Sequence, residues 1–366
     1  MKKNRKDIIY SLLVGVVFLG LSVFAWLKPS DDFSYTERRS LAQFPTLNLT
    51  SIADGIFMEK FEDYTLDQFP FREGFRGLKA VFQKYGFFQS DNNGIYLADG
   101  YISKMDVPYS EKATRNAVKK FQSIYDTYIK TSDAKVYFSM IPDKNYFLAE
   151  KNGYLSMDYD AFYENMEQEL DFMEYIKIHD LLTIEDYYYT DTHWRQENII
   201  EVAQRLSEKM GVTLKEDYEK VELDTPFYGV YYGQLALPVE PDKIAYLSHP
   251  LFEKCIVFDY EHQKEIPVYD LELATGKDPY EMFLSGSLSV ITIENPNATT
   301  DKELVIFRDS FGSSIAPLFA EGYQKITLFD IRYLNQNLIG NFVTFNNQDV
   351  LFLYSTGVIN NETAFH

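Results

Sequence analysis

Two short stretches of the chain carry the residue types of a serine-based acyl-transfer site. The first, residues 187–194, reads YYYTDTHW, and its Asp191 and His193 flank Thr192. In an extended segment alternate side chains point to the same side, so this carboxylate and imidazole can reach one site. A carboxylate beside an imidazole holds its tautomer and stabilises the imidazolium, which is the supporting half of a Ser-His-Asp triad.

The second stretch, LVIFRDSFGSS at residues 304–314, offers the serine that such a triad needs. Ser310 follows an apolar run and precedes Gly312. A sharp turn from a strand into a helix exposes a nucleophile in α/β proteins, and the helix N-terminus adds backbone N–H donors for an oxyanion. A serine in this place is also an ordinary helix N-cap, and an Asp and a His near a Trp also form structural hydrogen bonds. Together the two stretches indicate a serine hydrolase or acyltransferase.

A metal site is the alternative chemistry for the same residues. His179, Asp191 and His193 are the ligand types of a three-ligand zinc site. The sequence lacks an HExxH-type helix spacing, so we expect neither a metal nor another cofactor. We interpret His249, His262 and His366 as structural or solvated. Cys255 is the single cysteine, which excludes an intrachain disulfide and a thiolate cluster.

Composition narrows the class of partner. The 366 residues carry a formal net charge of −20, whereas nucleic-acid binding requires a basic footprint. Tyr and Phe number 29 each, and such rings serve either a packed interior or a surface for sugars.

Residues 8–27 run without a charge behind Lys2, Lys3, Arg5 and Lys6. A bilayer is spanned by about 20 apolar residues, and the basic flank stays in the cytoplasm. A cleaved signal peptide is the alternative. We expect a single-pass cell-membrane protein with a cytoplasmic tail (1–7), a transmembrane anchor (8–27), a juxtamembrane stalk (28–60) and an extracytoplasmic domain (61–366).

Within that domain, apolar periodicity predicts alternating strands and helices, an α/β signature. The DQFPFR stretch is interpreted as a turn whose Phe69 and Phe71 fill a core, and residues 92–102 as a hairpin. Residues 212–300 are predicted as a β-rich insertion. The other expected elements are helices over 111–130, 158–177, 199–210 and 313–321, and strands over 134–142, 178–184, 304–308, 325–331 and 349–355.

These residues meet a known family. DTHW (191–194) and RDSF (308–311) resemble the SGNH hydrolase-like DHHW proteins and the alginate O-acetylation proteins. Supporting similarities are ERRSLAQFP (37–45), DQFPFR (67–72), IPDK (141–144) and FYGVYYG (227–233). The resemblance implies a three-layer α/β/α core around a parallel sheet, in a permuted order in which the His block precedes the serine block. It implies Ser310 as nucleophile, His193 as general base and acid, and Asp191 as the residue that orients His193.

The sequence departs from the family pattern in two places. Arg308 stands ahead of Asp309 where SGNH proteins have Gly, and Thr192 stands where the DHHW name has His. The family's second oxyanion donors, a Gly N–H and an Asn side chain, would lie in the loops after 325–331 and 349–355. The candidates in those loops are Arg332, Tyr333, Asn335, Gly357 and Asn360; each is also an ordinary turn residue.

The function that the resemblance implies is O-acetyl transfer to, or acetyl-ester hydrolysis on, a cell-surface or secreted polysaccharide. A membrane-bound O-acyltransferase is the expected donor partner. Aromatic residues could form a floor for sugar rings or pack the core: Tyr187, Tyr188, Tyr189, Trp194, Tyr231 and Tyr232. The alternative is a non-catalytic glycan-binding or assembly module with the same fold. The two hypotheses differ in whether Ser310, His193 and Asp191 lie within hydrogen-bond reach beside a cleft.

Overall fold

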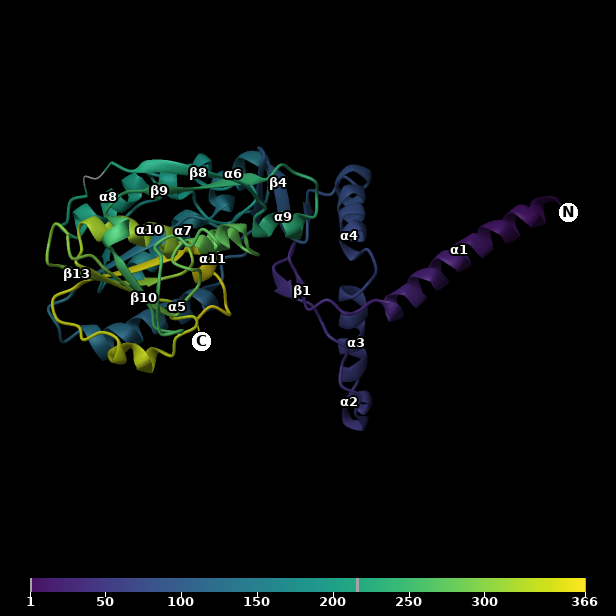
Figure 1. Ribbon diagram of the computed structural model, residues 1–366, viewed down its shortest axis with the longest axis horizontal. Helices are drawn as coiled ribbons and strands as arrows, with labels where there is room; N and C mark the ends of the chain where they lie inside the picture. The colour runs from purple at the N-terminus through teal and green to yellow at the C-terminus, as the bar shows by residue number, and fades with distance from the viewer. Residues whose placement is uncertain (1, 215–216, 366) are drawn as a thin grey trace. The chain divides into compact units, whose positions relative to one another are not determined.

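The computed structural model describes residues 2–214 and 217–365, with side chains from residue 5, and these form two compact units (Figure 1). One unit comprises Met1–Asn92 and Tyr232–Val239; the other comprises Asn93–Tyr231 and Glu240–His366. The larger unit contains the α/β core. It begins at Asn93, so residues 61–92, which we had assigned to the domain, group with the N-terminal segments.

The described core is built on an eight-stranded sheet in the order β11-β10-β12-β14-β13-β15-β6-β7. Strands β14, β13, β15, β6 and β7 run parallel, and the strands on the other side of β14 are antiparallel. The strand bounds are β6 (Lys135–Ile141), β7 (Glu174–Tyr175), β10 (Ile256–Asp259), β11 (Lys264–Ile266), β12 (Val290–Glu294), β13 (Glu303–Arg308), β14 (Lys325–Phe329) and β15 (Asp349–Ser355). The predicted mostly parallel α/β fold is confirmed.

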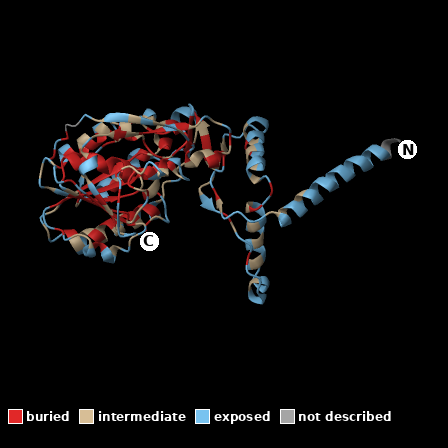
Figure 2. Ribbon diagram, in the orientation of Figure 1, coloured by how far each residue is buried: buried red, intermediate tan, exposed pale blue. Residues whose placement is uncertain are grey.

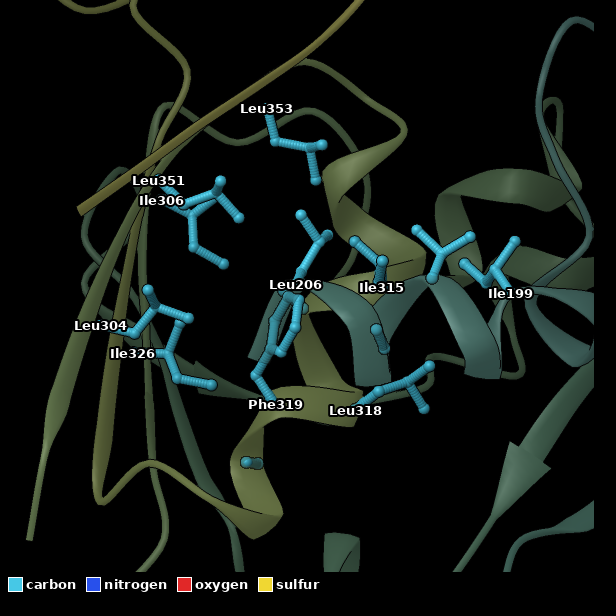
Figure 3. Packing of buried hydrophobic residues seen from close by; sticks show 14 of the residues in the cluster. Ile199, Leu206, Leu304, Ile306, Ile315, Leu318, Phe319, Ile326, Leu351 and Leu353 are labelled. Carbon is cyan, nitrogen blue, oxygen red and sulfur yellow. The ribbon is translucent and has the colours of Figure 1, made fainter. Parts of the chain in front are cut away.

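Helices cover both faces of this sheet. Along β13, Leu304 and Ile306 point to one face and join a core with α8 (Ile200–Lys209), α10 (Gly312–Ile315) and η8 (Ala316–Glu321) (Figure 3). Val305 and Phe307 point to the other face, against α5 (Glu111–Ile124) and α7 (Tyr159–Glu169). A parallel sheet buried on both faces needs such continuous apolar strands. The three-layer arrangement follows the prediction.

Several predicted elements hold, with changed ends. Ser110 caps α5 by accepting from the Ala113 N–H, and the helix continues as a π-helical turn, η2 (Tyr125–Ile129). The helix predicted over 313–321 becomes the short α10 and then the 3-10 segment η8, because Pro317 lacks an N–H for a longer α-helix. The predicted hairpin is confirmed by β4 (Ile95–Ala98) and β5 (Tyr101–Lys104).

Other predictions were wrong. The helix predicted over 158–177 stops at Glu169, since the chain then pairs as β7 with β6. The strand predicted over 178–184 is a loop that ends in the 3-10 turn η3 (Ile184–Asp186). Helix α6 (Lys144–Asn152) was not predicted; the Asp143 side chain caps it by accepting from the Asn145 N–H.

The predicted β-rich insertion is two structures. Its later strands, β10, β11 and β12, extend the main sheet, whereas β8 (Glu219–Phe227) and β9 (Asp242–Ser248) form a separate antiparallel pair. The short elements of this region are α9 (Val230–Leu235), η5 (Phe252–Lys254), η6 (Leu273–Thr275) and η7 (Pro279–Met282). Outside it, η4 (Gln196–Asn198) comes earlier in the chain, and η9 (Gln336–Asn341) and α11 (Thr356–Ile359) come later.

The N-terminal unit is mostly helical. Its elements are α1 (Lys2–Leu27), β1 (Phe33–Ser34), β2 (Arg39–Ser40), α2 (Leu49–Ala53), α3 (Ile56–Asp67), α4 (Arg72–Val81), η1 (Phe82–Gly86) and β3 (Asp91–Asn92). Within α1, Arg5–Leu27 is long and apolar enough to cross a membrane, and none of its residues is buried (Figure 2). Phe69 and Phe71 are 39% and 71% exposed, so the prediction that they fill a core was wrong.

Candidate active site

Ser310 lies at the carboxyl end of β13, the edge at which parallel strands commonly place ligands. The predicted sharp turn is present: the Gly312 N–H donates to Asp309 O at 3.0 Å and the Ser313 N–H to Ser310 O at 3.1 Å. A Cβ on Gly312 would lie 2.6 Å from the Cβ of Arg308, so a side chain there would force the turn open. Arg308 stands where the SGNH pattern has Gly. Its buried guanidinium donates to Leu288 O at 3.2 Å, and the turn that follows it is formed.

Asp309 ties this turn to the neighbouring strand. Its Oδ1 accepts from the Phe311 N–H at 3.1 Å, and its Oδ2 accepts from the Ser355 N–H at the end of β15 at 2.8 Å. Asp309 is fully buried. Its role follows from the geometry of the turn, which sequence pattern alone did not reveal.

The 187–194 loop is not the extended segment that we expected. It doubles back, with a bridge between Tyr187 and Trp194 and a hydrogen bond from the Tyr188 N–H to His193 O at 3.1 Å. Asp191 Oδ1 accepts from the backbone N–H of His193 at 3.1 Å, which closes the turn. Asp191 and His193 still meet, but through this local turn rather than strand alternation.

Two buried charges that the sequence analysis did not single out hold this loop. Lys144 Nζ donates to Tyr188 O at 2.8 Å and to Tyr189 O at 3.1 Å. Asp242 accepts from the Tyr189 N–H at 2.7 Å, the Thr190 N–H at 2.7 Å and Thr190 Oγ1 at 2.6 Å. Lys144 lies in the IPDK motif, which was a signal for it; Asp242 lies in the β-rich region and has no comparable signal.

The three predicted residues form a continuous chain of hydrogen bonds. His193 Nδ1 lies 2.6 Å from Asp191 Oδ1, and His193 Nε2 lies 2.7 Å from Ser310 Oγ. A carboxylate accepts hydrogen bonds only, so it holds the proton on Nδ1 and leaves Nε2 free to accept from the serine. Such an arrangement can take up the serine proton as Oγ attacks a carbonyl carbon.

Backbone from the FYGVYYG stretch positions the carboxylate. Asp191 Oδ2 accepts from the Val230 N–H at 2.9 Å, and Asp191 is fully buried. A Cβ on Gly229 would lie 2.3 Å from the Cα of Asp191, so glycine is required for this close approach.

The imidazole packs against a tyrosine that the sequence analysis missed. The Tyr280 ring stacks on His193 with 3.8 Å between centroids and 8° between planes. Ser314 Oγ accepts from Tyr280 OH and from Trp194 Nε1, each at 2.8 Å, and donates to Phe311 O at 3.2 Å. The Ser314 hydroxyl thereby joins the 187–194 loop, the turn at Ser310 and the 3-10 segment η7, with one hydrogen bond donated and two accepted.

A cavity of about 160 Å³ opens beside Ser310. Its lining includes Lys144, Thr192, Tyr231 and Gly357, together with the carboxyl side chains of Asp106 and Asp143. At about 30 Å³ per water molecule, the cavity has the size of a small acyl group with a few waters.

The ionisable groups around this cavity are strongly perturbed by burial. Burial lowers the pKa of Lys144 to about 7. Burial, and then the charge of Asp143, raises the pKa of Asp106 to about 7, against a lowering by the hydrogen bond from Asn360. Asp106 Oδ2 is buried without a hydrogen-bond partner in the described part of the chain. Asp143 is engaged by Tyr159 OH and Thr356 Oγ1, each at 2.7 Å from its Oδ2.

The oxyanion candidates separate into two groups. Gly357, after β15, lines the cavity. Asn360 instead accepts from the Ser110 N–H at 2.8 Å and donates to Asp106 Oδ1 at 2.9 Å. After β14, Arg332 is paired with Asp330 at 2.9 and 2.6 Å. Tyr333 is exposed, and Asn335 caps η9 through the Asn337 N–H. Of the five candidates, Gly357 is the one that lines the cavity beside Ser310.

Of the predicted aromatic floor, Tyr231 lines the cavity, with its OH 3.1 Å from Thr192 Oγ1. Tyr187, Tyr188 and Trp194 are fully buried in the hydrophobic clusters, which is the core-packing alternative. Tyr189 is exposed, 4.5 Å from the Tyr101 ring. Tyr232 belongs to the N-terminal unit.

The remaining histidines are engaged elsewhere. His179 stacks on Tyr163 at 4.4 Å, His262 pairs with Asp259 at 2.7 Å and His249 accepts from the Leu251 N–H at 3.2 Å. His366 lies outside the described residues. Over residues 2–214 and 217–365, no group of three His, Cys, Asp or Glu side chains has the arrangement of a metal site.

Comparison with solved structures places this geometry in a known fold. A DHHW family protein from Eubacterium siraeum aligns with a TM-score of 0.59 at 20% identity, over 74% of this chain and 94% of its own. The chain shares the fold of this DHHW protein. The predicted DHHW resemblance is thus confirmed at the level of fold.

Two further structures show similarity. PatB1 from Bacillus cereus aligns with a TM-score of 0.55 at 19% identity, over 74% of this chain and 99% of its own. The O-acetyltransferase domain of Pseudomonas putida AlgJ aligns with a TM-score of 0.43 at 13% identity, over 73% and 92%. No family model matches the sequence, and neither does any curated protein.

Proposed function

We propose that this protein is a membrane-anchored, extracytoplasmic O-acetyltransferase or acetylesterase that acts on a polysaccharide through Ser310, His193 and Asp191. The observation that carries the proposal is the unbroken chain of hydrogen bonds from Asp191 Oδ1 through the His193 ring to Ser310 Oγ, at 2.6 and 2.7 Å, beside a cavity. A binding module has no need of this geometry, whereas a serine nucleophile depends on it.

The reaction would proceed in two halves. His193 Nε2 takes the Ser310 proton as Oγ attacks the acetyl carbonyl carbon of a donor ester, and the imidazolium then protonates the leaving oxygen. A sugar hydroxyl or water gives its proton to Nε2 and attacks the acetyl-serine, and the proton returns to Ser310 Oγ. Transfer results when a sugar attacks, and hydrolysis when water attacks.

Backbone donors at the Ser310 turn and at Gly357 are the proposed oxyanion stabilisers. Gly357 is the second residue of α11, which follows β15 directly, and it lines the same cavity as Ser310. Loss of one such donor lowers kcat by about 10²–10³-fold in enzymes that use them. The cavity of about 160 Å³ suits a short acyl chain.

The anchor and partner belong to the same proposal. Arg5–Leu27 would hold the domain at the outer membrane face, where a membrane-bound O-acyltransferase would supply acetyl groups. Such supply matters because an activated acetyl donor is made inside the cell, on the other side of the bilayer from a proposed extracytoplasmic site.

A sulfonyl fluoride tests the nucleophile without knowledge of the glycan. PatB1 has been solved with a sulfonyl adduct, which makes the probe a natural choice for a chain with a similar fold. We expect one covalent adduct on Ser310 by peptide mass spectrometry, none in Ser310→Ala, and slow labelling in His193→Ala. Ser313→Ala is the matched control, because Ser313 is a buried neighbour whose hydroxyl donates to Gly286 O rather than to His193 or Asp191.

Turnover of an acetyl-ester reporter is measured on the same variants. Loss of turnover in Ser310→Ala, with Ser313→Ala near wild type, supports the enzyme. Full activity in Ser310→Ala, or an adduct on another residue, would overturn it. A wild-type chain that binds a glycan but takes no adduct and turns over no ester would instead support the non-catalytic module.

A further inference from the structure

The N-terminal unit presents an uncovered row of apolar side chains, which we call the apolar stripe: Phe71, Phe75, Leu78, Phe82 and Tyr85. They recur at the spacing of one helix face along α4 and η1. Their exposed fractions are 71%, 46%, 52%, 56% and 66%. A surface helix of a soluble protein turns such a face towards a core, so this one requires another apolar environment.

The opposite face of the helix is held within the same unit. Arg72 and Arg76 pair with Glu37 at 2.6 and 3.2 Å, and Arg76 also donates to Gly233 O at 2.7 Å. Ala80 is buried. Arg72 and Arg76 therefore face fixed partners within the unit, and the apolar stripe faces away from them.

The stripe begins in contact with the candidate membrane span. The Phe71 ring stacks on Phe24 of α1, with 5.9 Å between centroids and 9° between planes. Trp26 lies 6.5 Å from the Phe44 ring and 6.4 Å from the Phe61 ring. Phe24 lies within the last turn of Arg5–Leu27, so any bilayer that holds this helix has its boundary at the level of Phe71.

We propose that the apolar stripe lies in the interfacial layer of the membrane that α1 enters, so that α4 rests on an anionic lipid surface. Amphipathic helices of this kind bury their apolar face about 5–10 Å into the headgroup boundary. Each helical residue advances about 1.5 Å, so a side chain level with Phe24 lies a few ångströms inside the end of the span.

Charge along the stripe agrees with a lipid partner. Within residues 71–86, Arg72 and Arg76 are paired with Glu37, and Lys79 and Lys84 are further basic residues, in a chain whose net charge is −20. Lysines beside an apolar face are attracted to anionic headgroups when they lie near the membrane surface. Trp26 and the aromatic rings around it match the interfacial preference of such side chains.

The test uses the full chain reconstituted in vesicles of phosphatidylcholine and phosphatidylglycerol. In a Cys255→Ser background, Leu78→Cys carries a fluorescent label, and Lys79→Cys is the matched control on the adjacent, polar side. Phe82→Cys repeats the measurement on the next turn should Leu78→Cys fold poorly. We expect the labels at positions 78 and 82 to be quenched severalfold more by lipid-attached nitroxide than the label at 79, with the reverse order for iodide in water.

Two results would overturn the proposal. Labels at 78 and 82 that iodide quenches as strongly as the label at 79 would place the stripe in water. Labels shielded from both quenchers, in a manner that depends on protein density in the vesicle, would assign the stripe to a protein partner or a second copy. Replacing phosphatidylglycerol with phosphatidylcholine should reduce lipid quenching at 78 while α1 keeps the chain in the membrane.

Discussion

The site region and the N-terminal unit depart in opposite ways from the usual pattern of apolar side chains inside and charged side chains outside. Around Ser310, charged groups such as Lys144, Asp191 and Asp242 are buried. Along α4, the large rings of Phe71 and Phe75 are exposed. Buried polar groups and exposed apolar patches are the informative departures in a fold, because neither arises from burial of apolar surface alone.

The two regions differ in whether the chain itself supplies partners for these side chains. The buried charges of Lys144 and Asp242 form hydrogen bonds of 2.6–3.1 Å with the 187–194 loop, so the chain itself supplies their partners. The apolar stripe has its polar side satisfied by Glu37 and its apolar side directed outward. Buried charges that are hydrogen-bonded within the chain suit a site that must hold reacting groups in place. An apolar face that the chain leaves exposed suits contact with an apolar environment outside the protein.

The largest effect that we expect is the loss of turnover in Ser310→Ala. Loss of the nucleophile lowers kcat by about 10⁶-fold in a serine hydrolase in which this was measured. The free energy of unfolding should change by less than about 1 kcal/mol, since Ser310 makes its side-chain hydrogen bond to His193 at the cavity. Reporter kinetics and urea titration of the same preparation measure both; a variant that loses both activity and stability would show that Ser310 serves the fold.

Asp191→Asn should cost about 10⁴-fold in kcat, somewhat less than loss of the nucleophile. An amide can present its NH₂ to His193 Nδ1, which favours the tautomer with the proton on Nε2, so the imidazole can no longer accept from Ser310. The contact of the remaining oxygen with the Val230 N–H can persist, whereas the acceptor of the His193 N–H is lost, so the variant should fold with somewhat lower stability. Kinetics of the ester reporter measure the loss, and wild-type rates in Asp191→Asn would contradict the proposed role.

Asp242→Ala tests whether buried charge holds the histidine loop. The change removes the acceptor of two backbone N–H groups and the Thr190 hydroxyl, and takes away one of the two acids, Asp242 and Asp191, whose charges favour protonated Lys144. Breaking a buried charge arrangement costs about 3–5 kcal/mol. We expect that loss in the free energy of unfolding by urea titration.

Asp224→Ala is the control, because Asp224 is an exposed acid on the neighbouring strand β8. It should change the free energy of unfolding by no more than about 0.5 kcal/mol. Equal effects of the two variants would argue that net charge, rather than the hydrogen bonds between Asp242 and the 187–194 loop, sets the free energy of unfolding.

Asp106→Asn should change how stability depends on pH. Burial raises the pKa of Asp106 from 3.8 to about 7, so the folded state binds its proton more tightly than the unfolded state. This contribution to stability is fully present below about pH 4 and is lost as the pH rises to about 7. It amounts to at most about 4 kcal/mol.

Urea titrations at several pH values measure the slope. The wild type should lose stability across this window by a greater amount than Asp106→Asn, whose amide does not titrate. Asp143 lies beside Asp106 and burial raises its pKa as well, so part of the slope remains in the variant. Superimposable curves would show that Asp106 is not the group that titrates.

Sequence patterns predicted the centre of the sheet well, because β6, β13, β14 and β15 are local apolar runs. Strand β15 and the serine turn after β13 agree with residues 349–355 and 304–314 as read from periodicity. Asp191, His193 and Ser310 were predicted as partners from residue type and resemblance, and the structure brings them into hydrogen-bond distance. Local signals therefore sufficed where the chemistry lies at the ends of regular elements.

The rest depended on contacts between residues far apart in the chain. Lys144, Asp242 and Tyr280 come from three segments, and only folding shows that they surround one loop. Phe69 and Phe71 were predicted to lie in a core because apolar residues in a soluble domain usually do. That assumption fails for Phe71, whose ring packs on the candidate span.

The smallest effect is expected for Phe75→Ala, set against Phe121→Ala in the core. Phe121 is fully buried between α5 and the sheet, and truncation of a buried phenylalanine costs about 3–5 kcal/mol. Phe75 is 46% exposed on the apolar stripe, so its truncation should lower the free energy of unfolding by about 0.5 kcal/mol or less when no lipid is present. Urea titration followed by circular dichroism, which reports both units, measures both variants, and ester turnover should match wild type in Phe75→Ala. If Phe75→Ala costs as much as Phe121→Ala, the stripe is covered by protein in the folded chain, and its exposure to lipid is excluded. If the cost is small in solution while the variant shows weaker lipid quenching at position 78 in vesicles, then the rings act on the membrane and contribute little to the fold.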